Sequence, residues 1–334
     1  QKLLPFHPPM IWEETAEKKR KALASLIPEK WRIPTSQLPS DSQHSIVSFP
    51  KTSGLLSDEE LAITQLTVEE LATKIASGEY TAVQVCQAYC HRATIAHQLV
   101  NCLTEIFFDA ALERAKELDE YVKKNERTVG PLHGVPISLK DQFRVKGTEC
   151  SMGYVGWLGK VDEEDSVMTE CLRRAGAVLY VKTNVPQTLL AGETVNNIFG
   201  RTLNPYNRLL SCGGSSGGEG ALIALHGSSM GVGTDIGGSI RVPAGFNNLW
   251  GLKPSHGRMP YAKAANSMEG QETVHSVCGP LARTSRDLAY FLRSVLEQEP
   301  WKYDPKVIEM PWRESRYEEG KTGKKVFGVT AVRG

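Results

Sequence analysis

Residues 211–245 read SCGGSSGGEGALIALHGSSMGVGTDIGGSIRVPAG and place two glycine–serine clusters on either side of a short apolar run. The first cluster contains Ser215 and Ser216, the second ends at Ser239, and residues 219–226 between them favour a short helix. Glycine at this density lets a ligand approach the main chain closely and lets successive N–H groups point at one place. The stretch therefore predicts two glycine-rich turns, each carrying a serine, separated by a helix.

Two other interpretations of this stretch compete with a catalytic one. A flexible linker would lack the interleaved Ile236, Ile240 and Val242. A phosphate cradle would show G-x-x-x-x-G-K-[ST], or G-x-G-x-x-G at the start of a strand–helix unit, and neither pattern is present here. Two serines among backbone donors instead suit acyl transfer, which needs a nucleophilic hydroxyl, oxyanion donors and a second hydroxyl to relay a proton.

Three segments of the chain resemble the amidase signature family, in particular its fungal acetamidase-type members. GGSSGGEGALI at residues 213–223 and GVGTDIGGSIRVPAG at residues 231–245 match the serine motifs, and HGVPISLKDQF at residues 133–143 matches the lysine segment. N-terminal segments such as WEETAEKKRKALASLIPEKW at residues 12–31 extend the resemblance to nearly the whole chain. Family members are usually longer, so the resemblance also implies a domain that is incomplete at the C-terminus.

The resemblance assigns catalytic roles to three side chains. Ser239 is the expected nucleophile, Ser215 the bridging serine, reached through a cis peptide bond, and Lys140 the base. Four backbone N–H groups would form the oxyanion hole, those of Ile236, Gly237, Gly238 and Ser239. We expect a side chain at either of these glycines to obstruct the turn. A base that is a lysine must have a pKa below its ordinary value of about 10.4, and burial has this effect.

Each of these residues also has a structural interpretation. Lys140 follows the apolar residues 135–139, which predict a buried strand, but it could form a surface ion pair with Asp141. Ser215 and Ser216 could simply form turns, and Ser239 could be the N-cap of a helix over residues 240–246. A Ser–His–Asp triad is the rival nucleophile system because eight histidines are available, although no G-x-S-x-G elbow occurs.

Further residues are expected to support or line the site. Ser216 is expected to stabilise its loop through hydrogen bonds, and Asp235 and Arg241 to form a buried structural pair. The resemblance places Leu189 and Leu190 beside the acyl pocket, where leucines favour aliphatic acyl groups.

The alternation of helical and strand patterns predicts an α/β fold with a mixed central sheet covered by helices on both faces. Helices are expected over 68–77 with a capping box at Thr67, from Thr81 to about residue 95, over 110–123, from Asp165 to residue 174, and over 285–296. Strands are expected at 100–107, 135–139, 177–181, 250–253 and 325–331.

The N-terminal part of the chain suggests a separate segment. Residues 1–10 are expected to be extended, 11–27 helical and 34–54 a long surface connection. The basic run at residues 18–21 is interpreted as a solvated helix face, with membrane-surface contact as the alternative. The predicted division is an N-terminal segment over 1–60 and an amidase signature domain over 61–334.

Composition narrows the function classes. The 334 residues carry a net charge of +1, with no sign of nucleic-acid binding, a signal peptide or a transmembrane helix. Seven scattered cysteines argue against zinc and for reduced thiols in the cytoplasm, with Cys86 and Cys90 as two small buried side chains.

The resemblance implies an amidase that cleaves a small aliphatic amide such as acetamide through an acyl-serine, without metal or cofactor. Fatty acid amide hydrolase-like activity, a tRNA-dependent amidotransferase A subunit and a non-catalytic binding protein are the alternatives, and a homodimer is left open.

Overall fold

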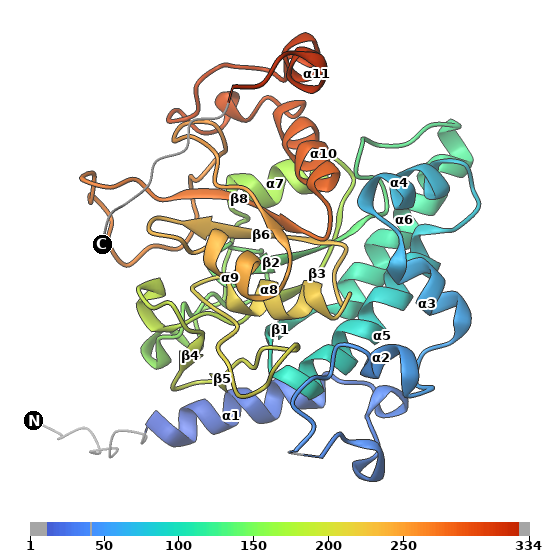
Figure 1. Ribbon diagram of the computed structural model, residues 1–334, viewed down its shortest axis with the longest axis vertical. Helices are drawn as coiled ribbons and strands as arrows, with labels where there is room; N and C mark the ends of the chain where they lie inside the picture. The colour runs from blue at the N-terminus through green and yellow to red at the C-terminus, as the bar shows by residue number, and fades with distance from the viewer. Residues whose placement is uncertain (1–11, 41, 327–334) are drawn as a thin grey trace, which may run out of the picture.

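A six-stranded sheet forms the centre of the molecule (Figure 1). The computed structural model describes residues 12–40 and 42–326. The strand order is β1-β3-β2-β6-β8-β7, in which β3, β2 and β6 run parallel and β1, β8 and β7 pair antiparallel to their neighbours. The predicted mixed α/β sheet is therefore confirmed.

The strands of this sheet are β1 (Leu103–Ile106), β2 (Pro136–Lys140), β3 (Val178–Thr183), β6 (Met230–Asp235), β7 (Trp250–Gly251) and β8 (Val277–Ala282), beside a small hairpin of β4 (Val195–Asn196) and β5 (Gly200–Arg201). The helices are α1 (Trp12–Ser25), α2 (Phe49–Thr52), α3 (Asp58–Gln65), α4 (Val68–Ala76), α5 (Ala82–Val100), α6 (Phe108–Asn125), α7 (Val167–Arg174), α8 (Gly217–Ala224), α9 (Arg241–Phe246), α10 (Ser285–Leu296) and α11 (Glu314–Thr322). Five 3₁₀ turns complete the described part, η1 (Glu29–Trp31), η2 (Thr35–Gln37), η3 (Val155–Trp157), η4 (Gln187–Leu189) and η5 (Pro300–Lys302).

The three parallel strands decide where a site can form. Every residue of β2, β3 and β6 is buried, as expected for strands covered on both faces. Because the strands are parallel, their carboxyl ends meet at one edge of the sheet, the usual place for a ligand in α/β folds. Lys140, Thr183 and Asp235 end these strands and so lie at that edge.

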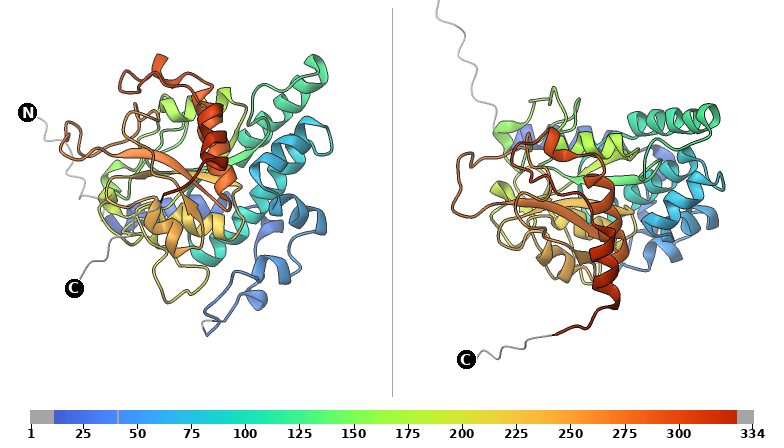
Figure 2. Two further views of the ribbon diagram at one scale, coloured as in Figure 1. Left: turned by 45° about the horizontal axis from the view of Figure 1, so that its top comes forward. Right: turned by 90° about the horizontal axis from the view of Figure 1, so that it is seen from above.

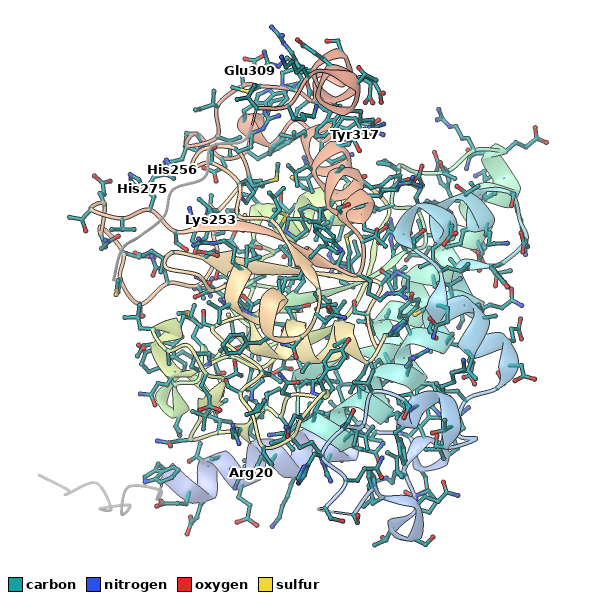
Figure 3. The ribbon with its side chains drawn as sticks, in the orientation of Figure 1. Arg20, Lys253, His256, His275, Glu309 and Tyr317 are labelled. Carbon is teal, nitrogen blue, oxygen red and sulfur yellow. The ribbon has the colours of Figure 1, made fainter. Side chains whose placement is uncertain are left out.

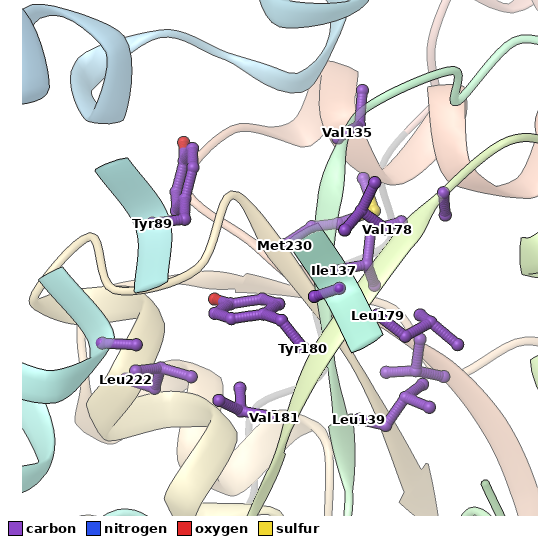
Figure 4. Packing of buried hydrophobic residues seen from close by; sticks show 14 of the residues in the cluster. Tyr89, Val135, Ile137, Leu139, Val178, Leu179, Tyr180, Val181, Leu222 and Met230 are labelled. Carbon is purple, nitrogen blue, oxygen red and sulfur yellow. The ribbon is translucent and has the colours of Figure 1, made fainter. Parts of the chain in front are cut away.

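Helices cover both faces of the sheet. Figure 2 shows α8 and α9 on one side of it and α6 and α7 on the other. In Figure 4, Leu222 of α8 points toward Val181 and Tyr180 of β3. Ile137 of the neighbouring strand β2 belongs to the same buried cluster. Gly218 allows this close packing, since a Cβ there would lie 2.3 Å from the backbone nitrogen of Asn184.

Most predicted helix starts are confirmed. Thr67 and Thr81 both form capping boxes, and Thr284 caps α10. The cap predicted at Asp165 is wrong, because Ser166 occupies the N-cap and its hydroxyl accepts from the N–H of Thr169. Asp165 instead accepts from the guanidinium of Arg173 at 2.8 Å.

Several predicted boundaries shift. The first strand is shorter than residues 100–107 because α5 continues to Val100 and Asn101 ends it in a left-handed conformation, φ 55°. The strand predicted at 250–253 is only Trp250–Gly251, and the helix predicted at 110–123 extends over Phe108–Asn125. The predictions for 1–10 and almost all of 325–331 lie outside the described residues.

The N-terminal segment is more tightly attached than predicted. Ile46 is fully buried and its N–H donates to the carbonyl of Pro205, so residues 34–54 are not simply a surface connection. The solvated-face interpretation is wrong for Lys19, which forms ion pairs with Glu105 and Glu149. The neighbouring Arg20, which Figure 3 labels on α1, donates to the carbonyl of Ile198. A domain boundary at residue 60 stays a prediction.

The described residues contain neither a membrane-spanning helix nor a cluster of metal-binding side chains. Over residues 12–40 and 42–326, none of the helices has the length and apolarity needed to cross a bilayer. Within the same ranges, histidine, cysteine and acidic side chains nowhere gather in a group of three or more that could hold a metal ion.

Candidate active site

Lys140 lies at the end of β2 and is completely buried, at 0% exposure. Its Nζ is 2.7 Å from Ser215 Oγ and 2.7 Å from Thr234 Oγ1. Thr234 donates its own hydroxyl proton to Gln142 Oε1 at 2.8 Å, so its oxygen is left to accept from Lys140. The lysine is thus held between two hydroxyls with its amino group directed at Ser215.

The alternative of a surface ion pair between Lys140 and Asp141 is wrong. Asp141 is also buried and pairs with Lys182 of β3, whose Nζ lies 3.3 Å from its carboxylate. Successive residues of a strand point to opposite faces, which separates the two neighbours. Burial lowers the pKa of Lys140 to about 7, although Asp235 and Glu219 act in the opposite direction. A large share of the amino groups is therefore neutral near pH 7.

The two serine turns meet at this edge. The Gly214–Ser215 peptide bond is cis, as the resemblance implies. The N–H of Ser216 donates to the carbonyl of Ser239 at 3.1 Å, which holds the two turns together. Ser215 and Ser239 line the same cavity, but no hydrogen bond joins their hydroxyls in the described structure.

The structure shows what the side chain of Ser216 contacts and that Ser239 does not cap a helix. The hydroxyl of Ser216 accepts from the N–H of Thr234 at 3.4 Å, so it links the first turn to β6. The N-cap of α9 is Ile240 without a side-chain cap, so the capping role considered for Ser239 is wrong. The Ser239 hydroxyl is therefore not occupied by capping the helix.

The backbone N–H groups of the second turn differ in their availability. Gly238 N–H donates to Asp235 Oδ1 at 2.8 Å and is therefore occupied. Within residues 12–40 and 42–326, the N–H groups of Ile236, Gly237 and Ser239 have no hydrogen-bond partner. The expected obstruction is wrong for Gly237, where a Cβ would meet nothing within 4 Å. At Gly238 the backbone has φ +135°, and a Cβ there would lie 3.0 Å from Cγ2 of Val242.

Asp235 fixes the second turn. Its carboxylate accepts from the N–H groups of Gly238 and Ile240 and from the guanidinium of Arg241, with both side-chain contacts at 3.0 Å. Burial acts to raise the pKa of Asp235, but these hydrogen bonds outweigh it and lower the pKa. The predicted pair is only half buried, because the side chain of Arg241 is 54% exposed.

A cavity of about 410 Å³ opens in front of the serines. Leu189 and Leu190 line it together with Met152 and Met268, and a role of the two leucines in binding an acyl group stays a prediction. Leu190 is exposed, and Thr188 and Leu189 both adopt a left-handed backbone, φ 67° and 61°. The cavity wall beside the serines is thus partly aliphatic.

The histidines near the cavity do not form a triad. His256 and His275 stack on each other at its rim with ring centroids 3.9 Å apart, and Figure 3 shows them side by side on neighbouring loops. Among the described residues, no histidine hydrogen-bonds to Ser215 or Ser239. The lysine is the basic group that the structure places beside a serine of these turns.

Sequence reasoning missed three residues of the site. Thr234 and Gln142 orient Lys140, and the only signal was their position next to the recognised motifs. Glu219 is fully buried in α8, and a lone acidic residue within GGEGALIA was a detectable signal.

Comparisons with known proteins identify the family of the chain. A family model described as "Amidase" matches residues 84–330. The chain is 63% identical to an acetamidase of Emericella nidulans over 307 residues, which cover 92% of this chain and 55% of that protein. It is 56% identical to an acetamidase of Aspergillus oryzae over 308 residues, which cover 92% of this chain and 56% of that protein.

A solved fatty acid amide hydrolase superposes with a TM-score of 0.88 and 43% identity, covering 91% of this chain and 54% of the other. The chain belongs to the amidase signature family. It spans about half the length of the curated relatives it matches.

Proposed function

We propose that the protein hydrolyses a carboxylic amide, first of all a small aliphatic amide such as acetamide, to a carboxylate and ammonia. The observation that carries this proposal is the 2.7 Å contact between Lys140 Nζ and Ser215 Oγ in a fully buried setting. A nucleophilic serine needs a base, and a lysine whose pKa is about 7 can act as one near neutral pH.

In the proposed first half-reaction, Ser239 Oγ attacks the amide carbon. Its proton passes to Ser215 Oγ while the proton of Ser215 passes to Lys140 Nζ. The N–H groups of Ile236, Gly237 and Ser239, which have no partner in the described part of the chain, are the candidates to stabilise the oxyanion, since Gly238 N–H is already bonded to Asp235.

The protonated Lys140 then returns the proton, through Ser215, to the departing nitrogen, and ammonia leaves with an acyl-serine behind. In the second half-reaction water attacks the acyl carbon, the same relay takes up its proton, and the carboxylate is released with Ser239 restored. The balance needs one water and no metal or organic cofactor.

A larger acyl group is the second candidate. The cavity of about 410 Å³ with Leu189, Leu190 and Met268 in its wall exceeds what a two-carbon acyl group fills. A fatty acid amide hydrolase among the similar structures supports the same candidate. A series of primary amides of increasing chain length distinguishes the two by the kcat/KM of each member.

The cellular setting is also a proposal. Seven free, buried cysteines suit reduced thiols in the cytoplasm. We propose that the protein binds a small-molecule amide and no nucleic acid. We also propose a homodimer, and light scattering of the protein in solution tests this oligomeric state.

Labelling with a fluorophosphonate, followed by intact mass, tests the nucleophile. We expect one adduct on the Ser239 peptide, its loss in Ser239→Ala and its retention in Ser255→Ala, an exposed serine outside the cavity lining. Ammonia release from acetamide, without ATP or a partner subunit, separates the hydrolase from an amidotransferase subunit. A folded protein that takes no label would instead favour a non-catalytic binding protein.

A further inference from the structure

Glu219 is a buried acidic residue that the proposed reaction does not use. It lies in the first turns of α8 at 0% exposure. One carboxyl oxygen, Oε2, lies 2.5 Å from Ser138 Oγ, and the other, Oε1, lies 2.9 Å from Thr183 Oγ1. Both partners are hydroxyls, which can donate and accept. Thr183 donates to Oε1, and Ser138 can accept a proton carried by Oε2, because its own hydroxyl proton has the carbonyl of Met230 at 3.5 Å as another acceptor.

These two hydroxyls belong to strand positions next to the proposed base. Ser138 precedes Lys140 by two residues on β2, so their side chains share one face of the sheet. Thr183 is the register partner of Lys140 on β3. The carboxyl group of Glu219 therefore connects α8 to both strands at the position of the base.

The sheet has a recess that accommodates this carboxyl group. Gly231 of β6 is the register partner of Ser138. A Cβ at Gly231 would lie 1.7 Å from Glu219 Oε2 and 2.8 Å from Ser138 Oγ. The carboxyl group thus occupies the space that the side chain of any other residue at position 231 would fill. Glycine at this position is therefore required for the contact between Glu219 and Ser138.

The surroundings of Glu219 favour its neutral form. Among the described residues no cation donates to it, since Lys140 Nζ bonds to Ser215 and Thr234 instead. A carboxylate buried without a paired cation is costly, and taking up a proton removes that cost. Burial raises the pKa of Glu219 to about 8, against the opposing effects of Ser138, Thr183 and Lys140.

We propose that Glu219 is a positioning residue of this site, a buried carboxylic acid that stays protonated while Lys140 acts as the base. The inference rests on the proposed function. A neutral carboxyl group fixes β2 and β3 through Ser138 and Thr183 without stabilising the ammonium form of Lys140. Its ionisation would favour that ammonium form and remove the base. The other titratable groups near it are Tyr180 of β3 and Cys102 before β1.

Glu219→Gln and Glu219→Leu test this role, with Glu120→Gln on the exposed side of α6 as the control. Glutamine reproduces the shape of the protonated acid, so we expect kcat/KM within about fivefold of the parent and an unmoved acid limb of its pH profile. Leucine leaves both hydroxyls without their partner, and we expect a loss of more than about tenfold. Any decline of activity above about pH 8 in the parent should be absent in Glu219→Gln.

A folding measurement tests the protonation state without relying on catalysis. The pKa of Glu219 is raised in the folded state, so the parent loses stability as pH rises from about 5 toward about 8. Relative to Glu219→Gln, its urea midpoint should fall by roughly 1 M across this window, while Glu120→Gln follows the parent. The infrared band of a protonated carboxyl group, absent in Glu219→Gln, is the spectroscopic signature at pH 6.

The outcomes separate the two proposals. Parallel midpoints for parent and Glu219→Gln across pH 5–8, or an acid limb displaced by a full pH unit in that variant, would overturn the role of Glu219. A protein that takes no label at Ser239 but keeps the pH-dependent midpoint would overturn the proposed function and leave the neutral carboxyl group established.

Discussion

Two lysines at the ends of neighbouring parallel strands show how differently the same burial can act. Lys140 of β2 and Lys182 of β3 are both at 0% exposure. They lie one register position apart, because Leu139 is opposite Lys182 and Lys140 is opposite Thr183. Their side chains therefore lie on opposite faces of the sheet.

The partners of the two lysines differ. Among residues 12–40 and 42–326, Lys140 has two hydroxyls and no carboxylate within hydrogen-bond distance, and burial lowers its pKa to about 7. Burial also acts to lower the pKa of Lys182, but the surrounding acidic groups, with Asp141 at 3.3 Å, outweigh it and raise the pKa. Burial alone does not produce a base; burial without a paired carboxylate does.

Lys140→Met gives the largest expected effect. Methionine has a similar length and suits an apolar position, so the fold should persist while the proposed base is lost. We expect kcat/KM on the amide substrate to fall on the order of 10⁴-fold, as when a member of a catalytic triad is removed. Steady-state kinetics measures this, with the thermal midpoint as the control for folding. A loss of less than tenfold would contradict a base at this position.

Lys182→Met should act on stability. It leaves the buried Asp141 carboxylate without its cation, and breaking a buried pair in this way costs roughly 3–5 kcal/mol. Urea unfolding of the variant measures the loss. The matched control is the double variant Lys182→Met/Asp141→Asn, which removes the charge as well and should recover part of the stability. An undiminished free energy of unfolding in the single variant would show that the pair contributes nothing.

The sequence was most informative where short-range rules apply. The apolar residues 135–139 predicted a buried strand ending at Lys140, and Thr67, Thr81 and Thr284 each capped the predicted helix. The N-cap predicted at Asp165 was wrong because two adjacent residues, Asp165 and Ser166, could each cap the helix. The carboxylate of Asp165 pairs with Arg173, and Ser166 is the N-cap.

Contacts between distant segments could not be predicted. Lys19 of α1 is anchored by Glu105 of β1 and by Glu149, which lie far from it in the sequence. The carboxyl group of Glu219 fits beside β2 because Gly231 lies on a third strand. No periodicity or motif spacing specifies such contacts, since they depend on how the strands are ordered in the sheet.

The pH dependence of stability gives the smallest expected effect but distinguishes the two lysines most directly. A pKa lowered from 10.5 to about 7 means that the unfolded chain binds more protons at Lys140 between these values, so stability rises with pH in that window. Between pH 7 and pH 9 the parent should gain about 2 kcal/mol relative to Lys140→Met. The raised pKa of Lys182 changes stability in the opposite direction, because its contribution is fully present below about pH 10.4 and is lost only as pH rises above it.

The free energy of unfolding of Lys182→Met, measured with urea at each pH, should therefore lie below that of the parent and change in parallel with it between pH 7 and pH 9. If Lys140→Met were the parallel curve, Lys140 would be charged in the folded protein, and a neutral lysine could not be the base.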